Sequence, residues 1–364
     1  MKQYTDSDEA EEPRATDVWV VVGAGPAGIA TVGKLIDCGT EPASITWVDP
    51  QFKVGDFGAK WGNVPSNTTV SRFLEFLRSC RSFGTDGTTP DFAIYSMDPK
   101  GTCILNDVAE PLQWITQRLM KSVRTLRSEV TSIRPEDPRW LLHTSVRDIS
   151  AKNVVLAVGA EPRRLPYPTP TVSLEEAFDV RRLRNAVHQE DVVGVFGSSH
   201  SAILAIRNLL EVGAVRVINF YRSPLLFAVD YGDWILYDNI GLKGKTAEWA
   251  RQDMKRVPPE RLLRVASDDT TVRHYLPQCT KVVYSVGFDA RCPRVEGADP
   301  TKYDQKTGVI APGLFGCGIA FPERVVDRVG NVEFNVGLLK FAKFLHRVVP
   351  LWMSMAKQEP RVLS

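Results

Sequence analysis

The fold of this chain is decided by Val18-Trp-Val-Val-Val22, which is followed directly by Gly23-Ala-Gly-Pro-Ala-Gly28. The first five residues form a continuous apolar run, which is typical of a strand buried on both faces of a parallel sheet. The next six residues form a glycine-rich loop that opens a helical pattern from Ile29 to Cys38. Gly39 then stands where a glycine commonly ends a helix.

Each glycine of this loop meets a different physical need. Gly23 permits a tight turn, Gly25 lets a pyrophosphate approach the backbone, and Gly28 lets helix and strand pack closely. The free N–H groups at the positive end of the helix attract that pyrophosphate. We therefore expect the whole loop to contact a cofactor, with Pro26 and Ala27 included.

An acidic residue completes the pattern. A second strand, Ser44 to Val48, ends at Asp49, which lies 21 residues after Gly28 and can accept hydrogen bonds from a ribose. The order of strand, glycine loop, helix, strand and acid predicts a dinucleotide site. The alternative is an ordinary glycine-rich turn between a strand and a helix.

A degenerate copy of the pattern occurs later in the chain. Its parts are the strand Val192 to Phe196, the loop Gly197-Ser-Ser-His-Ser-Ala202, the helix Ile203 to Glu211 with its stop Gly213, and the strand Val215 to Phe220. An alignment of Gly197 on Gly23 without gaps puts Ser199 on Gly25 and Ala202 on Gly28. Small residues therefore remain where the backbone must approach a ligand closely.

The acid is missing from the copy. The same alignment puts Ser223 on Asp49, and Arg222 stands just before it. A 2′-phosphate needs a cation at this place, whereas a free 2′-hydroxyl prefers an acid. The copy therefore favours NADPH over NADH, although Arg222 could also be a solvated surface arginine. The expected contacts are Gly197, Ser198, Ser199, Ser201 and Arg222.

Other segments complete an α/β pattern. Asp107 to Ser122 predicts a helix, Val123 to Ile133 and Trp140 to Val146 predict strands of a small meander, and Asn153 to Val158 predicts a buried strand. Lys281 to Val286 repeats that buried ending after the second copy. The prolines and glycines from Pro162 to Pro170 are typical of a crossing between domains.

Together these features resemble the flavoproteins with two dinucleotide-binding domains. This superfamily includes thioredoxin-reductase-like enzymes, flavin-containing monooxygenases and ornithine or lysine N-hydroxylases. The resemblance, from Val18 to about Leu345, implies an α/β fold of two Rossmann-like domains with the NAD(P)H domain inserted in the FAD domain. It implies FAD-binding parts at 17–165 and 281–364, the latter with a C-terminal helix, and an NAD(P)H-binding domain at 166–280. Residues 1–16 are polar and acidic, and we expect a disordered tail.

Three further motifs carry the resemblance. Leu156 to Ala160 is similar to the crossover strand of the family, Leu314 to Gly318 to its late FAD motif, and Glu129-Val130 to its adenine clamp. The implied FAD contacts are Val130, Gly159, Gly318 and Ile319. The chain departs from the family at Val158, where a threonine is usual, and at Ile319, where an aspartate normally holds a ribityl hydroxyl.

The stretch Gly55 to Asn67 is similar to a Gly-x-Trp stretch of flavin monooxygenases. The resemblance implies that Trp61 and Asn63 lie near the flavin, because an indole can stack beside the flavin rings. The alternative is a core tryptophan. His200 could donate a proton near the nicotinamide, but we expect it to face solvent at the start of its helix.

Composition excludes several classes of function. The net charge of +2 predicts no nucleic-acid partner. The six cysteines form no C-x-x-C pair, so we predict neither a metal site nor a dithiol relay. No run of 18 apolar residues occurs, and the run from Val336 to Met355, which charges and Pro350 interrupt, predicts a core-facing helix instead of a membrane span.

We expect a cytoplasmic protein with a small-molecule substrate and with FAD and NADPH as cofactors, and a homodimeric state is one of the open alternatives. Three functions remain open at this stage. The first is an FAD-dependent oxidoreductase reduced by NAD(P)H without a dithiol relay. The second is a flavin-dependent N- or S-monooxygenase, and the third is a non-enzymatic nucleotide-binding or redox-sensing protein. The sequence assigns no catalytic residue.

Overall fold

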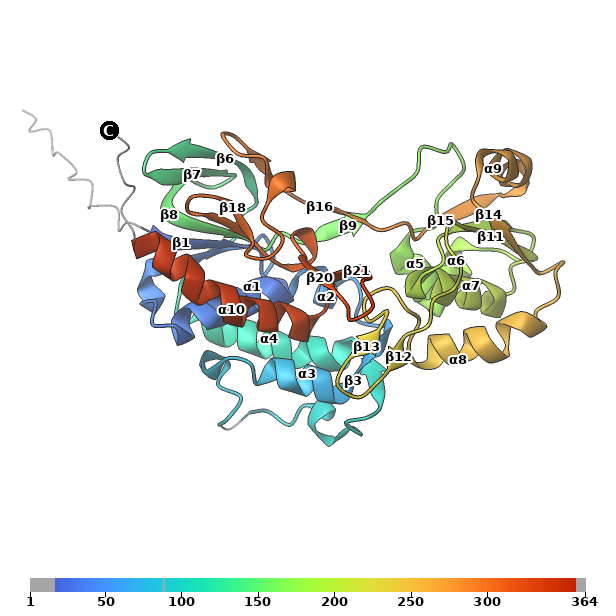
Figure 1. Cartoon of the computed structure of the whole chain (residues 1–364), viewed down its shortest axis with the longest axis horizontal. Coiled ribbons are helices and arrows are strands. Elements are labelled where there is room, and N and C mark those ends of the chain that lie inside the picture. Colours follow the sequence, from blue (N-terminus) through green and yellow to red (C-terminus); the bar gives the residue numbers. More distant parts are fainter. Residues whose placement is uncertain (1–16, 88, 358–364) are drawn as a thin grey trace, which may run out of the picture.

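The structure is a computed structural model that describes residues 17–87 and 89–357. The tail expected at residues 1–16 lies outside the described residues, as do residues 358–364. Figure 1 shows two lobes that meet in the middle of the molecule. The first lobe holds both ends of the described chain, and the second lobe is built from the middle of the sequence, as the α/β prediction with an inserted domain requires.

The first unit is built on a nine-stranded sheet within the described residues. The strand order β17-β6-β7-β8-β1-β2-β5 combines a parallel centre with an antiparallel meander, and β19 and β18 extend the sheet beside β8. The strands are β1 (Asp17–Val22), β2 (Ile45–Val48), β5 (Arg124–Leu126), β6 (Val130–Glu136), β7 (Arg139–Thr144), β8 (Ile149–Leu156), β17 (Arg294–Val295), β18 (Val309–Ala311) and β19 (Leu314–Gly316).

The segment Val123 to Ile133 does not form one strand of the meander, as the sequence suggested. Its first part, β5, pairs in parallel with β2, and its second part, β6, pairs antiparallel with β7. Residues 127–129 carry the chain from the edge of the sheet to the meander. An apolar pattern alone does not show where one strand ends and the next begins.

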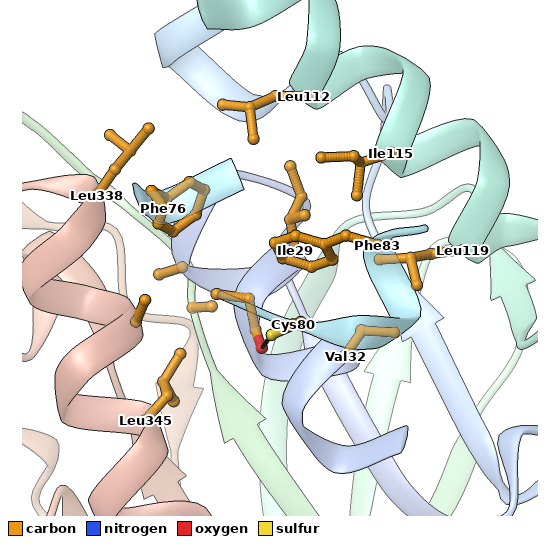
Figure 2. Packing of buried hydrophobic residues seen from close by; sticks show 14 of the residues in the cluster. Ile29, Val32, Phe76, Cys80, Phe83, Leu112, Ile115, Leu119, Leu338 and Leu345 are labelled. Atoms are coloured by element: carbon orange, nitrogen blue, oxygen red, sulfur yellow. Dashed lines mark hydrogen bonds between the residues drawn. The ribbon is translucent and has the colours of Figure 1, made fainter. Parts of the chain in front are cut away.

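Helices cover one face of this sheet. Figure 2 shows α1 (Pro26–Asp37) at the centre of a cluster that also holds side chains of α3 (Val70–Leu77), α4 (Asn106–Met120) and α10 (Leu338–Lys357). Because most of α1 is buried, the N-terminus of this helix is fixed firmly relative to the sheet. The C-terminal helix α10 faces the core as predicted, and no helix among residues 17–87 and 89–357 has the length and apolarity needed to span a membrane.

The second unit is a four-stranded parallel sheet in the order β14-β11-β10-β15. Its strands are β10 (Val192–Phe196), β11 (Arg216–Tyr221), β14 (Leu262–Ala266) and β15 (Lys281–Tyr284). Helix α7 (His200–Val212) packs on one face, and α9 (Asp269–Tyr275) packs on the other. Because β15 pairs with β10, the expected domain boundary after residue 280 is wrong and lies beyond this strand.

Chain crossings and side-chain contacts join the two units (Figure 1). Both chain crossings pass through a small antiparallel pair, β9 (Ala160–Pro162) and β16 (Phe288–Ala290). The segment after the hairpin of β12 (Val229–Asp230) and β13 (Ile235–Leu236) reaches back to the first unit. There Asp238 pairs with Lys340 at 2.6 Å, so this contact is a half-buried polar one.

Candidate cofactor site

The first glycine loop is closed by contacts that only glycine allows. Gly23 has φ 105°, and a Cβ at this residue would lie 2.4 Å from the carbonyl oxygen of Ala157. A Cβ at Gly28 would lie 1.9 Å from the oxygen of Gly23. The tight turn and the close helix packing predicted for these two glycines are therefore present in the fold.

Gly25 differs from Gly23 and Gly28 because no described residue would clash with a Cβ on it. A Cβ there would approach only the Cα of Gly55, at 4.0 Å. Gly55 itself has φ 55°, and a Cβ on it would lie 2.9 Å from the Cα of Gly25. Two glycines without side chains thus face each other beside the N-terminus of α1. Pro26 is the first residue of this helix, where the N–H that proline lacks would have no partner in the helix. This opening fits the close approach of a pyrophosphate.

Asp49 lies at the end of β2, where the sequence predicted the acid, and it is buried. Its Oδ2 accepts a hydrogen bond from the backbone N–H of Ala24 at 2.7 Å, and its Oδ1 accepts from Gln51 at 2.8 Å and Phe52 at 2.6 Å. The carboxylate therefore holds the glycine loop in place. A carboxylate has about four acceptor positions, so a ribose contact stays a prediction that this geometry permits.

The late motif packs against the same helix end. Gly318 has φ 81°, and a Cβ on it would lie 2.7 Å from the Cβ of Ala27, which brings Ile319 to the N-terminus of α1. Gly159 follows β8 with φ 73°, and its carbonyl accepts the N–H of Arg291 at 3.1 Å. Val130 begins β6 and is buried. Gly318 therefore packs against the first helix, and FAD contacts at Val130, Gly159 and Ile319 stay predictions.

Trp61 and Asn63 lie at the contact between the two units. The Trp61 ring packs 5.9 Å from the ring of Phe178, at the end of α5 (Leu174–Phe178). Asn63 donates a hydrogen bond at 2.9 Å to Asp179, which is the N-cap residue of α6 (Val180–Ala186). This hydrogen bond lowers the pKa of the aspartate. The structure therefore gives both residues partners in the second unit, and a flavin contact stays a prediction.

The second glycine loop repeats the backbone contacts of the first. Gly197 has φ 125°, and a Cβ on it would lie 2.3 Å from the oxygen of Ser285. Its N–H donates to Phe220 at 2.9 Å, as the N–H of Gly23 donates to Val48 at 2.7 Å. The internal repeat predicted from the sequence is therefore present in three dimensions.

The remaining residues of this loop surround the N-terminus of α7. Ser198 precedes the helix, Ser199 is its exposed N-terminal flanking residue, and Ser201 lies half-buried in its first turn. The N–H of Ile203 donates to the oxygen of Ser199 at 3.1 Å, so the first turn is closed in the usual way. The expected nucleotide contacts are thus brought together at one helix end.

The strand pairing corrects the alignment of the two copies. Val48 pairs opposite Val22 and lies 26 residues after it, whereas Phe220 pairs opposite Phe196 and lies only 24 residues after it. The connection in the second unit is thus two residues shorter. Tyr221, and not Ser223, takes the place of Asp49, and Arg222 is exposed directly after it. The acid is still missing, and the arginine is still adjacent.

The corrected register identifies another pair of equivalent residues. Trp47 donates from Nε1 to the oxygen of Gly23 at 2.9 Å. Asn219 stands in the matching position and donates from Nδ2 to the oxygen of Gly197 at 2.8 Å. Two different side chains therefore support the first glycine of each loop, which sequence similarity between the copies could not indicate.

Arg264 on β14 is a candidate that the sequence analysis missed. Its guanidinium lies 4.8 Å from the centre of the Tyr221 ring, and its Nε donates to Asn219 Oδ1 at 2.9 Å. Burial lowers the pKa of this arginine, and its Nη2 is buried without a hydrogen-bond partner within the described part of the chain. The position of the missing acid is therefore flanked by two arginines, Arg222 and Arg264.

His200 does not face solvent, so that expectation is wrong. It begins α7, and α8 (Gly244–Gln252) covers it, with His200 Nε2 lying 3.5 Å from Thr246 Oγ1. Burial lowers the pKa of His200 to about 4, so the imidazole is neutral at physiological pH. Its Nδ1 is buried and has no partner among the described residues.

None of the six cysteines, all of which are described, forms a disulfide. All six are free thiols, and burial raises the pKa of five of them. The pKa is raised to about 12 for Cys80 and Cys317, and to about 11 for Cys103, Cys279 and Cys292. These thiols are therefore protonated at neutral pH and are poor nucleophiles. The residues that the structure describes also contain no cluster of His, Cys, Asp and Glu suited to a metal.

Two glycine loops of matching geometry, each between a parallel strand and a helix, define an FAD/NAD(P)-binding oxidoreductase of two dinucleotide-binding domains. The family model described as pyridine nucleotide-disulphide oxidoreductase matches residues 17–225, and the chain belongs to this family. It is also 34% identical to the monooxygenase AgnR1 of Paecilomyces divaricatus, over 92% of this chain and 97% of that protein. The chain is therefore an FAD-dependent oxidoreductase, and the non-enzymatic alternative falls away.

Solved structures share the fold at low sequence identity. A flavin-containing monooxygenase from Stenotrophomonas maltophilia matches with a TM-score of 0.61 and 14% identity, over 93% of this chain and 98% of that chain. The bacillithiol disulfide reductase Bdr from Staphylococcus aureus matches with a TM-score of 0.62 and 11% identity, over 94% and 99%. Both similarities extend over the two units.

Proposed function

We propose that this enzyme binds FAD in the first unit, is reduced by NADPH bound in the second, and oxygenates a small molecule without a thiol relay. One observation carries the proposal. The two glycine loops have the same backbone contacts, but the acid Asp49 follows one, whereas Tyr221 with two neighbouring arginines follows the other. That difference matches one cofactor without and one with a 2′-phosphate.

The first loop would hold FAD through backbone groups. A Cβ at Gly25 would meet only the Cα of Gly55 at 4.0 Å, so the bare backbone there stays free of side chains, and the N-terminus of α1 supplies free N–H groups for a pyrophosphate. Ile319 lacks the side chain that family members use for a ribityl hydroxyl, so its backbone would act instead. Bound FAD supplies the redox chemistry, and the protein contributes binding, orientation and exclusion of water.

The second loop would hold NADPH at the N-terminus of α7. Ser198, Ser199 and Ser201 offer hydroxyl and backbone donors to the phosphates. Arg222 is exposed at the end of β11 and can form two hydrogen bonds with a 2′-phosphate, while Arg264 adds a second positive charge. NADH would lack the partner for these arginines.

The monooxygenase subtype is favoured over a reductase by two observations. The 34% identity to monooxygenase AgnR1 spans nearly the whole of both proteins. The buried cysteines have raised pKa values, and a thiol relay needs a reactive thiolate. An NAD(P)H-dependent reductase that passes electrons to another small acceptor is the second candidate.

The test is the visible spectrum of the purified protein before and after anaerobic addition of NADPH. We expect a flavin spectrum, release of FAD on heating, and bleaching by NADPH that is faster than by NADH. Re-admission of air then separates the two candidates. A reductase without its acceptor would release hydrogen peroxide promptly, whereas a monooxygenase would release hydrogen peroxide only slowly. Release of FMN, or no bleaching by either nucleotide, would refute the proposal.

A further inference from the structure

A cavity of about 310 Å³ lies between the two units, beside the second glycine loop. The first unit contributes β3 (Pro65–Thr69) and β4 (Thr102–Ile104), and the second unit contributes α7 and α8. The cavity therefore forms only when both units are in place. Its volume is at the lower end of the range for small-molecule sites.

The charge of this cavity has one sign. Arg207, Lys243 and Lys245 line it, and no carboxylate does. The two neighbouring cavities differ, because Asp238 is among the residues that line one of them and Glu211 among those that line the other. A site with basic side chains and no acid attracts an anion.

Two of the three cations have no acidic partner of their own. Lys243 forms an ion pair with Asp238, which offsets much of its charge. Arg207 and Lys245 form no ion pair with any residue of 17–87 or 89–357. The uncompensated charge of the cavity therefore comes from these two side chains, one on α7 and one on α8.

The rest of the lining suits an organic molecule more than an inorganic ion. Pro65, Ile104 and Leu204 provide an apolar wall. His200 also lines the cavity, and its Nε2 lies 3.5 Å from the hydroxyl of Thr246. Apolar and polar groups side by side suit an organic molecule that carries a polar end.

We propose that this cavity is the substrate site and that the substrate is a small organic anion, a carboxylate or phenolate on an apolar body. The anion would lie between Arg207 and Lys245, and the apolar body would lie against Leu204 and Ile104. The term substrate rests on the proposed function, but the binding of an anion does not.

The test is isothermal titration calorimetry of the purified full-length protein with 2-naphthoate and with its uncharged counterpart, 2-naphthamide. We expect the carboxylate to bind about tenfold more tightly than the amide, which corresponds to about 1.4 kcal/mol. Arg207→Gln and Lys245→Gln should each weaken naphthoate several-fold and leave naphthamide unchanged. Lys245 is exposed, so its substitution keeps the fold even where the Arg207 variant does not.

The matched control is Arg256→Gln, which removes an arginine of the same unit that does not line the cavity and is 79% exposed. It should change neither affinity. Saturating NADP⁺ should leave naphthoate binding in place. Equal affinities for the acid and the amide, no binding of naphthoate, or its displacement by NADP⁺ would each overturn the proposal. None of these outcomes depends on flavin reduction by NADPH, so the two proposals can fail separately.

Discussion

Removal of the Arg222 side chain should change the choice of nicotinamide cofactor. Arg222 is exposed directly after β11, beside the position that the acid Asp49 occupies in the first unit. Within the described residues it forms no ion pair or side-chain hydrogen bond, so Arg222→Ala should leave the fold intact. The substitution therefore tests cofactor recognition and not stability.

The size of the effect follows from the geometry of a guanidinium. An arginine can donate two charge-assisted hydrogen bonds to a phosphate, each worth about 1.5–3 kcal/mol. Solvent screens an exposed pair, so we expect a net loss of at least about 1.4 kcal/mol, which is a tenfold weaker binding of NADPH. Arg264 remains over Tyr221, so part of the preference for NADPH should persist. The affinity for NADH should not change.

The assay is an anaerobic titration with NADPH and with NADH, followed by the loss of flavin absorbance. Arg216→Ala is the matched control, because Arg216 lies at the other end of the same strand, away from the second glycine loop. Equal weakening for both nucleotides would mean that Arg222 supports the fold. No weakening for either would place Arg222 in solvent and remove the main argument for NADPH.

Three further predictions concern FAD, the thiols and stability. Gly25→Val should abolish FAD binding with little change in the melting temperature of the flavin-free protein, because the added side chain fills only the opening beside the loop; a variant with full flavin content would show that this loop is not the site. Cys317→Ala should still be bleached by NADPH, and a loss of bleaching with FAD retained would contradict the absence of a thiol relay. Asp191, which pairs with Lys281 at 2.7 Å, has a pKa lowered to about 2, chiefly by hydrogen bonds from His188 N–H, Lys281 and Thr280 that outweigh its burial. Its stabilisation of about 2 kcal/mol should be present above pH 4 and lost as the pH falls toward 2. The unfolding free energies of wild type and Asp191→Asn should therefore converge over that range, and a constant difference would refute this.

Local sequence patterns were enough to predict the two glycine loops, the strands and helices that flank them, and the internal repeat. These features depend on local backbone geometry. Gly23 and Gly197 have positive φ values, and a side chain on either would collide with the end of a neighbouring strand. The need for glycine at these two positions is therefore visible in the sequence. The lack of a C-x-x-C pair could also be read directly from the spacing of the cysteines.

The residues that stand beside those loops became known from the three-dimensional fold. The two-residue shift that puts Tyr221 in place of Asp49 follows from strand pairing, and the position of Arg264 follows from β14 lying next to β11. His200 and Trp61 acquired their surroundings from the contact between the two units. Neighbours across a sheet or across an interface come from distant parts of the chain, and no local pattern of residues specifies them.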